Sequence, residues 1–452
     1  MDVNKLKRVY FLGIGGIGMS ALARFFKAQG AIVSGYDRMP TALTHQLIAE
    51  GMQIHFTDDV ALIDKEAELY IYTPAIPKDM QERVWLEAQQ APLYKRSDAL
   101  QWITQALYAI TVAGTHGKTT VSTMIAYLLR ETGFGCNAFL GGISVNYGSN
   151  YWGSPNKVAV VEADEYDRSF LKLFPDVAVL TAMDPDHLDI YGTPRAVEEA
   201  FIQYTYNIKP SGTLVVKHGL KQAHELNNTF TITYSLSDTH ADVYGYDIEN
   251  VNGGYKFQIM GKGWAMHDVV LPIGGLHNVE NAIAAITVAH LQGISHDSIR
   301  QALSGFKGIK RRFEYIINNG DTVYIDDYAH HPEELHALIT SAKKLFPHME
   351  CVVMFQPHLF SRTNDFATGF AESLSEADEV VLLDIYPARE LPMPGVTSEL
   401  ISKQMTMTPV TILSKEDAVQ SMKNHKHKLV ITAGAGDIDK LIEPIKNILL
   451  EA

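Results

Sequence analysis

Residues 113–120, AGTHGKTT, have the composition of a loop that binds nucleotide phosphates. Glycines in such a loop allow backbone N–H groups to turn inward, Lys118 can reach the terminal phosphates, and Thr119 can bind Mg²⁺ through its hydroxyl. Val112 stands where the strict pattern has glycine, so the match is incomplete, and a turn that binds nothing is the alternative. The loop predicts an ATP site at Gly114, Thr115, His116, Gly117, Lys118, Thr119 and Thr120.

A cluster of carboxylates follows the apolar start of VVEADEYD, residues 160–167. Carboxylates directly after a buried strand commonly hold a cation beside phosphates, which predicts Mg²⁺ binding by at least one of them. The alternative is a solvated acidic turn. His187, in MDPDHLDIYG, also follows a strand-like run and is interpreted either as a structural histidine or as a metal ligand. The acidic residues are Glu162, Asp164, Glu165 and Asp167.

A glycine-rich turn near the N-terminus, in FLGIGGIGMS, lies between a strand-like run and a helical segment. Its spacing fits G-x-G-x-x-G, with an aspartate at the end of the following strand, a pattern that suggests NAD. A helix N-terminus attracts any diphosphate, so UDP fits equally well. A turn that serves only packing is the third interpretation. The residues concerned are Gly13, Gly15, Gly16, Gly18 and Asp37.

Polar side chains follow two strand-like runs in the last third of the chain, in YIDDYAHHPEE and FQPHLFSRT. Ligands bind at the carboxyl ends of strands in open α/β sheets, and histidine with arginine there can receive a carboxylate. Helix capping and ordinary surface polarity are the alternative. The adjacent histidines also suggest a transition-metal site, but no further ligand spacing accompanies them. The residues are Asp326, Asp327, Tyr328, His330, His331, His358 and Arg362.

Alternating strand-like and helical segments must position these motifs. Residues 8–37 have the pattern of a βαβ unit, and similar alternation begins again near residues 109 and 312. Asn-Gly-Gly at 252–254 predicts a hairpin turn within residues 228–275. The sequence therefore predicts an α/β protein with a Rossmann-like domain (1–108), a central P-loop ATPase-type domain with a mixed sheet (109–311), and a C-terminal Rossmann-like domain (312–452).

The composition argues against several classes of protein. The 38 Lys and Arg residues against 52 Asp and Glu give a net charge of -14, which opposes binding to nucleic acid or to an anionic membrane. Cys136 and Cys351 are the only cysteines, too few for a disulfide framework or a four-thiolate metal site. We find no export signal and no apolar stretch of about 18 residues, so we expect a cytoplasmic protein without membrane or nucleic-acid partners.

Motifs along nearly the whole chain resemble those of the Mur ligase family, in the same order. They are GIGGIGMS, AGTHGKTT, EADEYD, DPDH, GLHN, KRRFE, DDYAHHP, FQPHLFSRT and TAGAGD. The resemblance implies a ligase that uses ATP to convert a carboxylate into an acyl phosphate, with ADP and phosphate as products. FQPHLFSRT and LDIYPARE are most similar to the branch that adds L-alanine to UDP-N-acetylmuramate in peptidoglycan synthesis. The alternative is the recycling branch, which adds L-Ala-γ-D-Glu-meso-diaminopimelate and shares EADEYD.

The resemblance also implies roles for individual residues. The N-terminal domain would bind the UDP-sugar, Lys118 would hold the γ-phosphate of ATP, and Arg312 would reach the transferred phosphate. Asn278 and Asn281 would face the adenine. The implied ligands of one or two Mg²⁺ ions are Thr119, Glu162 and His187.

On the amino-acid side, the resemblance implies a site formed by four residues of the C-terminal domain. A base must deprotonate the attacking ammonium group, and His330 and Asp327 are the two candidates. We expect a monomer or a weak homodimer. The amino-acid residues are Tyr328, His330, His358 and Arg362.

The sequence departs from the family pattern at two places. Leu359 stands where family members often have arginine, and no lysine occurs between His187 and Lys209, so we predict no carbamylated lysine.

Two functions from other classes are the alternatives to a ligase. An NAD-dependent oxidoreductase would use the first glycine turn but would leave Lys118 and Arg312 without a role. A nucleotide-dependent regulatory protein would tolerate the loss of Lys118.

Overall fold

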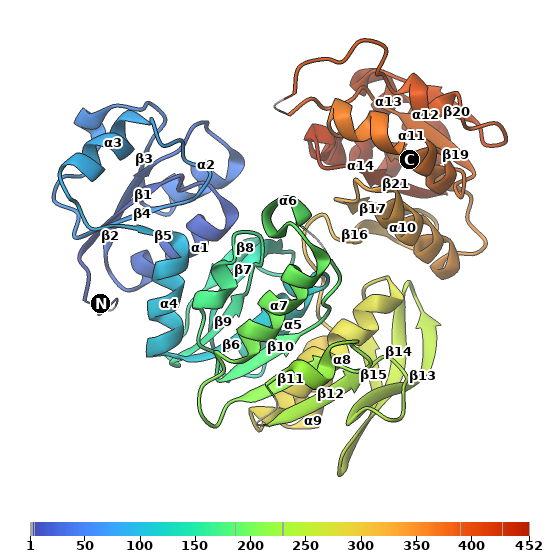
Figure 1. The fold of residues 1–452 in the computed structure, drawn as a ribbon. Helices are drawn as coiled ribbons and strands as arrows, with labels where there is room; N and C mark the ends of the chain where they lie inside the picture. The colour runs from blue at the N-terminus through green and yellow to red at the C-terminus, as the bar shows by residue number, and fades with distance from the viewer. Residues whose placement is uncertain are drawn as a thin grey trace. The chain divides into compact units, whose positions relative to one another are not determined.

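The computed structural model describes residues 3, 5–185, 187–227, 230–388, 390–426 and 428–451 (Figure 1). Asp186 of DPDH, Arg389 of LDIYPARE and residues 228–229 of the expected hairpin region therefore lie outside the described residues. Backbone packing divides the chain into two compact units. The first comprises residues 1–246, 258–267 and 280–303, and the second comprises residues 247–257, 268–279 and 304–452.

The first sheet is parallel throughout, in the order β3-β2-β1-β4-β5. Its strands are β1 (Arg8–Leu12), β2 (Ile32–Tyr36), β3 (Gln53–His55), β4 (Leu69–Tyr72) and β5 (Leu93–Lys95). The accompanying helices are α1 (Ile17–Ala28), α2 (Ala42–Ala49), α3 (Gln81–Ala88) and α4 (Arg96–Ala106). The apolar run that forms β1 is buried from Val9 to Leu12, as a strand covered on both faces requires.

The central sheet is mixed, in the order β15-β14-β13-β12-β11-β10-β6-β9-β7-β8. β6 pairs in parallel with β9 and β10, whereas β7 and β8 are antiparallel. Its strands are β6 (Tyr108–Ala113), β7 (Asn137–Ser144), β8 (Ser149–Trp152), β9 (Val158–Glu162), β10 (Val177–Leu180), β11 (Thr213–Lys217), β12 (Thr231–Ser235), β13 (Val243–Val251), β14 (Gly254–Gly261) and β15 (Trp264–Leu271). The helices are α5 (Lys118–Glu131), α6 (Leu188–Tyr191), α7 (Pro194–Thr205), α8 (Leu276–Leu291) and α9 (His296–Leu303).

The expected hairpin turn joins β13 to β14. Asn252 and Gly253 both have positive φ, 52° and 79°, the conformation that a two-residue hairpin turn requires. The prediction from the Asn-Gly pair is confirmed.

The third sheet has the order β16-β17-β21-β18-β19-β20, with only β16 antiparallel to its neighbour. Its strands are β16 (Glu314–Asn318), β17 (Val323–Asp327), β18 (Cys351–Phe355), β19 (Glu379–Leu382), β20 (Val410–Ile412) and β21 (Leu429–Ala433). The helices are α10 (Pro332–Leu345), α11 (Phe360–Leu374), α12 (Glu399–Ser402), α13 (Lys415–Ser421) and α14 (Ile442–Leu450). Short 3₁₀ helices occur at Val60–Leu62, Ser169–Lys172, Ala223–Glu225, Met422–His425 and Asp437–Leu441. The expected α/β class, with mainly parallel outer sheets and a mixed central sheet, is confirmed.

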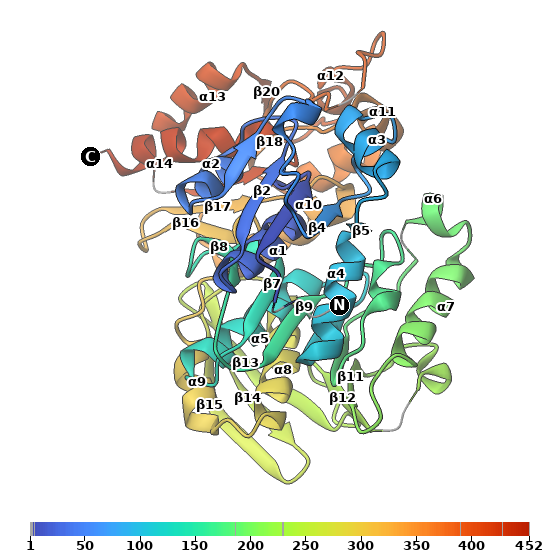
Figure 2. The ribbon, with the colours of Figure 1, turned by 90° about the vertical axis from the view of Figure 1, so that its left-hand side faces the viewer.

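Within the first unit, α1 packs against β7 and β8, the last two strands at one end of the central sheet, as Figure 2 shows. Phe25 of α1 lies 5.3 Å from Phe139, between ring centroids, and Phe139 lies 5.5 Å from Tyr151. Buried Arg24 donates to the side-chain oxygen of Asn150, whose amide donates to Ser20 at 3.0 Å. Apolar packing and satisfied polar groups therefore fix the first sheet to the central sheet.

Candidate functional site

The AGTHGKTT segment, called the phosphate loop below, connects β6 to α5, as its sequence predicts. Gly114 and Gly117 have φ of 133° and 82°, which side-chain-bearing residues rarely adopt. A Cβ at Gly114 would lie 2.7 Å from the amide nitrogen of Ala182, so the loop packs too closely on the segment after β10 to accept alanine. Two glycines therefore set the shape of the loop, and the second directly precedes α5.

Lys118, the first residue of α5, is folded back over the loop. Its Nζ donates to Glu165 Oε1 at 2.7 Å and to the carbonyl oxygen of Gly114 at 2.9 Å. Thr119 is the next residue, and its hydroxyl donates to Glu162 Oε1 at 3.0 Å. Adjacent residues of the helix thus engage two different carboxylates of the EADEYD segment.

Strand pairing explains how Glu162 reaches the loop. β9 runs parallel to β6, and Glu162 pairs with Val112, two residues before Gly114. The second carboxylate oxygen of Glu162 accepts from the backbone N–H of Gly141 at 3.0 Å. Burial raises the pKa of Glu162, and the nearby Lys118 ammonium opposes that rise.

Glu165 was only one of four acidic candidates in the sequence, but the structure gives it a distinct position. It is 1% exposed, and its Oε2 has no hydrogen-bond partner among the residues that the structure describes. Burial raises its pKa, and Lys118 again opposes the rise. His187 Nε2 lies 4.0 Å from Glu165 Oε1, so His187 also belongs to this corner of the central sheet.

These oxygens fit a cation that also binds phosphate. Mg²⁺ is held through one or two carboxylates together with substrate phosphates, and the unpartnered Glu165 oxygen is an acceptor that such an ion would satisfy. Across the residues described, no group of three or more His, Cys, Asp and Glu side chains is arranged to hold a metal by itself. A cation here would therefore take the rest of its ligands from bound phosphate and water.

Asn278 and Asn281, the residues expected to face adenine, both lie on α8 and are largely buried. Asn278 donates from its side chain to the Gly274 carbonyl at 2.7 Å. A Cβ built on Gly117 would lie 2.8 Å from Asn281 Oδ1, so Asn281 is next to the phosphate loop.

The N-terminal glycine turn connects β1 to α1 as expected. Gly13 has φ of 85°, and Asp37, directly after β2, accepts the Gly15 N–H at 2.7 Å. Gly16 is the N-cap of α1, and because glycine has no side chain it makes no side-chain hydrogen bond to the first N–H groups of the helix. At Gly18 a Cβ would lie 2.1 Å from Arg96 Nη1, so this glycine makes room for an arginine from α4. The expected glycines and Asp37 are thus brought together, and Arg96 is a neighbour that the motif did not predict.

In the second unit, the KRRFE segment has a strained backbone held by carboxylates. Arg311 and Phe313 have φ of 60° and 47°. Arg311 donates to Asp326 at 3.1 Å, whereas Asp327 accepts the backbone N–H groups of Phe313 at 2.6 Å and Ala329 at 2.7 Å. Burial raises the pKa of Asp326 and of Asp327 to about 6. Both carboxylates therefore hold backbone and arginine in place around Arg312, whose guanidinium carbon lies 5.9 Å from the Tyr328 ring centroid.

The four residues expected at the amino-acid site lie close together after β17 and β18. The ring of His330 is 5.3 Å from Tyr328 and 6.3 Å from His358, between centroids, and Arg362 Nη1 is 3.4 Å from His358 Nδ1. Burial lowers the pKa of both histidines, and Arg362 lowers them further. The cluster therefore combines a cation with two imidazoles that favour the neutral form.

His330 has a defined tautomer in this arrangement. Its Nδ1 lies 2.9 Å from the carbonyl oxygen of Tyr328, and because a carbonyl only accepts, Nδ1 carries the hydrogen. The lone pair of Nε2 is then available as a proton acceptor. His331 instead directly precedes α10, and its backbone N–H donates to Glu334 Oε2 at 3.1 Å.

Two further residues of this cluster were not predicted individually. The ring of Tyr386 stacks on His358, with centroids 5.8 Å apart and planes at 16°. Glu390 accepts the N–H of Ser361, beside Arg362, at 3.0 Å. Both belong to LDIYPARE, which sequence reasoning used only as a mark of resemblance. Leu359 precedes α11 with φ of 71° and donates its N–H to the carbonyl oxygen of Tyr386 at 2.9 Å.

Over the described part of the chain, no helix is long and apolar enough to cross a membrane.

Family models match three consecutive segments of the chain. Residues 8–108 match the model "Mur ligase family, catalytic domain", residues 112–289 the "Mur ligase middle domain", and residues 311–436 the "Mur ligase, glutamate ligase domain". The three matches follow the same order as the three sheets.

Curated relatives and solved structures are similar over nearly the full length. The UDP-N-acetylmuramate–L-alanine ligase of Cytophaga hutchinsonii is 45% identical, covering 99% of this chain and 97% of the relative, and that of Porphyromonas gingivalis is 46% identical, covering 98% and 99%. The crystal structure of UDP-N-acetylmuramate–alanine ligase from Thermotoga maritima is 26% identical, with a TM-score of 0.82 over 98% of both chains. A murein peptide ligase from Psychrobacter arcticus, 23% identical with a TM-score of 0.68 over 99% of both chains, shares the fold. Because relatives at this identity span both chains almost completely, the protein belongs to the Mur ligase family.

Proposed function

We propose that this protein joins L-alanine to UDP-N-acetylmuramate in peptidoglycan precursor synthesis, using ATP and forming an acyl-phosphate intermediate. The observation that carries this proposal is the full-length identity of 45–46% to ligases named for that reaction. The phosphate loop with Lys118, Thr119 and Glu162 provides the local chemistry that an ATP-dependent ligase needs.

The reaction requires activation because a carboxylate is a poor electrophile. The lactyl carboxylate of the sugar attacks the γ-phosphorus of ATP, ADP leaves, and the amine of alanine then displaces phosphate from the acyl carbon. Lys118 stabilises the charge on the phosphate oxygens during transfer, and we assign Arg312 to the transferred phosphate. For this, Lys118 exchanges Glu165 and the Gly114 carbonyl for phosphate oxygens.

We propose that Mg²⁺ binds through Thr119, Glu162 and His187, with Glu165 as a further oxygen ligand. When bound, the ion neutralises phosphate charge. Glu162 is already oriented by the Thr119 hydroxyl and the Gly141 N–H, which reduces the reorganisation needed on binding. The remaining ATP-binding residues are the loop from Gly114 to Thr120 with Asn278 and Asn281.

For the amino acid, we propose a site formed by Tyr328, His330, His358 and Arg362. Arg362 receives the carboxylate of alanine, and the free Nε2 of His330 accepts the proton from its ammonium group. Asp327 is the weaker candidate for the base, because its two oxygens already accept backbone N–H groups.

We assign residues 1–108 to UDP-sugar binding through Gly13, Gly15, Gly16, Gly18 and Asp37, residues 109–311 to ATP, and residues 312–452 to the amino acid. We further propose a cytoplasmic monomer or weak homodimer that uses no nucleic-acid or membrane partner.

Phosphate release from ATP and Mg²⁺ tests the substrate assignment. The assay uses UDP-N-acetylmuramate with either L-alanine or L-Ala-γ-D-Glu-meso-diaminopimelate as the acceptor, and mass spectrometry identifies the nucleotide product. We expect turnover with L-alanine. A preference for the tripeptide, or no turnover with either acceptor, would reject the assignment.

A further inference from the structure

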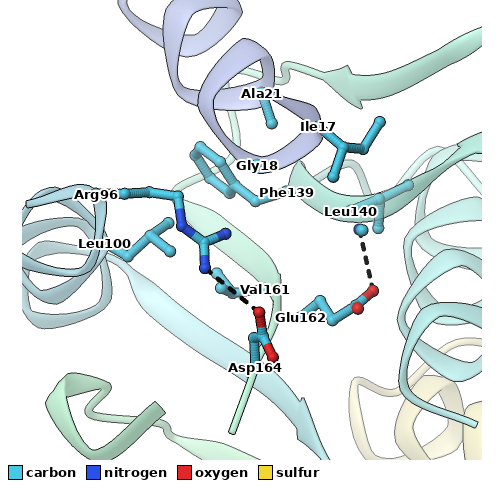
Figure 3. Close-up of a pocket in the computed structure, with 11 residues that line it drawn as sticks. Ile17, Gly18, Ala21, Arg96, Leu100, Phe139, Leu140, Val161, Glu162 and Asp164 are labelled. Carbon is cyan, nitrogen blue, oxygen red and sulfur yellow. Dashed lines mark hydrogen bonds and ion pairs between the residues drawn. The ribbon is translucent and has the colours of Figure 1, made fainter. Parts of the chain in front are cut away.

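A pocket of about 180 Å³ lies in the first unit, between α1 and α4 on one side and β7 and β9 on the other (Figure 3). Gly18 lines it near the N-terminus of α1, and Glu162 lines it at the end of β9. Apolar side chains, including Leu100 and Phe139, form much of the remaining wall. Pockets for whole drug-sized ligands are typically about 300 Å³ or larger, so this one suits part of a ligand.

Arg96, the first residue of α4, extends its guanidinium along this pocket, as Figure 3 shows. Its side chain is 21% exposed, and its Nη2 lies 3.7 Å from Asp164 Oδ2, with which it forms an ion pair. Within the described residues, Arg96 donates no hydrogen bond, although a guanidinium carries five N–H donors. The N–H donors of Arg96 are therefore available to a ligand that supplies acceptors.

Two features of this pocket attract an anion, although the carboxylates of Glu162 and Asp164 also line it. Nη1 of Arg96 lies so close to Gly18 that a Cβ there would approach it to 2.1 Å. The first N–H groups of α1 have no acceptor within the helix, and Gly16 provides no side-chain cap. The guanidinium of Arg96 and the positive end of the α1 dipole therefore both attract an anion to the same part of the pocket.

We propose that Arg96 is a positioning residue that binds an oxyanion of the UDP-sugar in this pocket and exchanges Asp164 for it when the donor binds. The proposal rests on the function proposed above and assigns the side chain that orients the donor between α1 and Glu162. Two oxyanions of the donor share this chemistry, the diphosphate and the lactyl carboxylate.

Calorimetric titration of the full-length protein, without ATP or Mg²⁺, distinguishes the two sources. The ligands are UDP-N-acetylmuramate, UDP-N-acetylglucosamine, which lacks the lactyl group, and UDP. We expect Arg96→Gln to weaken binding of UDP-N-acetylmuramate by roughly 10- to 100-fold, the effect of losing a charged hydrogen bond. An equal loss for all three ligands identifies the diphosphate, and a loss restricted to the muramate identifies the carboxylate.

Two variants separate ligand binding from a structural ion pair. Asp164→Asn removes the ion pair but leaves Arg96 in place, so it should bind the donor at least as tightly as the wild type. Arg195→Gln removes an exposed arginine on α7 and controls for the lost positive charge. Unchanged donor affinity in Arg96→Gln, or an equal loss in Asp164→Asn, would overturn the proposal. Failure of the wild-type protein to bind any of the ligands would reject the proposed function itself.

Gly18→Ala provides an independent test, because the added methyl displaces the far end of Arg96 rather than backbone. It should weaken donor binding, and combining it with Arg96→Gln should cause little further loss. A double variant whose loss equals the product of the single losses would contradict the coupling of Gly18 to Arg96.

Discussion

Lys118 of the phosphate loop and Glu165, which follows β9, form a largely buried ion pair. Lys118 Nζ lies 2.7 Å from Glu165 Oε1, and the two side chains are 15% and 2% exposed. The lysine assigned to the γ-phosphate is therefore held by a carboxylate from a neighbouring strand end until phosphate replaces it.

Replacing Lys118 with methionine should abolish phosphate release and leave the protein folded. Removing one partner of a buried pair leaves the other uncompensated, at a cost of up to about 3–5 kcal/mol. Part of that cost should be recovered in the double variant Lys118→Met with Glu165→Gln, which urea unfolding would detect. Normal turnover by Lys118→Met would contradict the ATP site, and equal unfolding midpoints for single and double variants would contradict the importance of the pair.

Thr119 should matter through its hydroxyl. Thr119→Val removes the group that orients Glu162, and we expect the Mg²⁺ concentration for half-maximal phosphate release to rise by roughly tenfold or more. Thr119→Ser keeps the hydroxyl and is the matched control. Equal Mg²⁺ dependence in the valine variant and the wild type would argue against this site.

Whether a feature of this site could be predicted depends on how far apart its residues lie in the sequence. The Asn252–Gly253 turn follows from local conformational preference, so the sequence was sufficient to predict it. The Lys118–Glu165 pair joins residues 47 positions apart and requires β6 to lie beside β9, an adjacency that no local pattern specifies.

The same reason explains the neighbours that sequence reasoning missed. Arg96 meets Gly18 because α4 returns to α1, and Tyr386 meets His358 because β18 and β19 are adjacent in the sheet. Asp327 was considered as a base because of its residue type, whereas its two backbone hydrogen bonds could be known only from the structure.

The pH dependence should report His330. Burial lowers its pKa below the usual 6.5, so the neutral form persists to lower pH and the acidic limb of kcat/KM for alanine should lie below pH 6.5. Glu334 raises this pKa, so Glu334→Gln should move the limb to still lower pH. His330→Gln should lower kcat and remove the limb. An unchanged pH profile in His330→Gln would exclude it as the base.

Asp327→Asn separates the structural role from the alternative role as the base. The amide replaces one acceptor oxygen with a donor facing a backbone N–H, which should cost about 1–3 kcal/mol of folding free energy. Urea unfolding measures this loss directly. Unchanged stability together with a large loss of kcat would instead favour Asp327 as the base.

The fate of the carboxylate oxygen tests the central claim most directly. UDP-N-acetylmuramate labelled with ¹⁸O in both carboxylate oxygens is converted with ATP and L-alanine, and mass spectrometry follows the released phosphate. If the carboxylate attacks the γ-phosphorus, each phosphate released carries one ¹⁸O atom and the amide keeps the other. Phosphate without the label would contradict the acyl-phosphate mechanism.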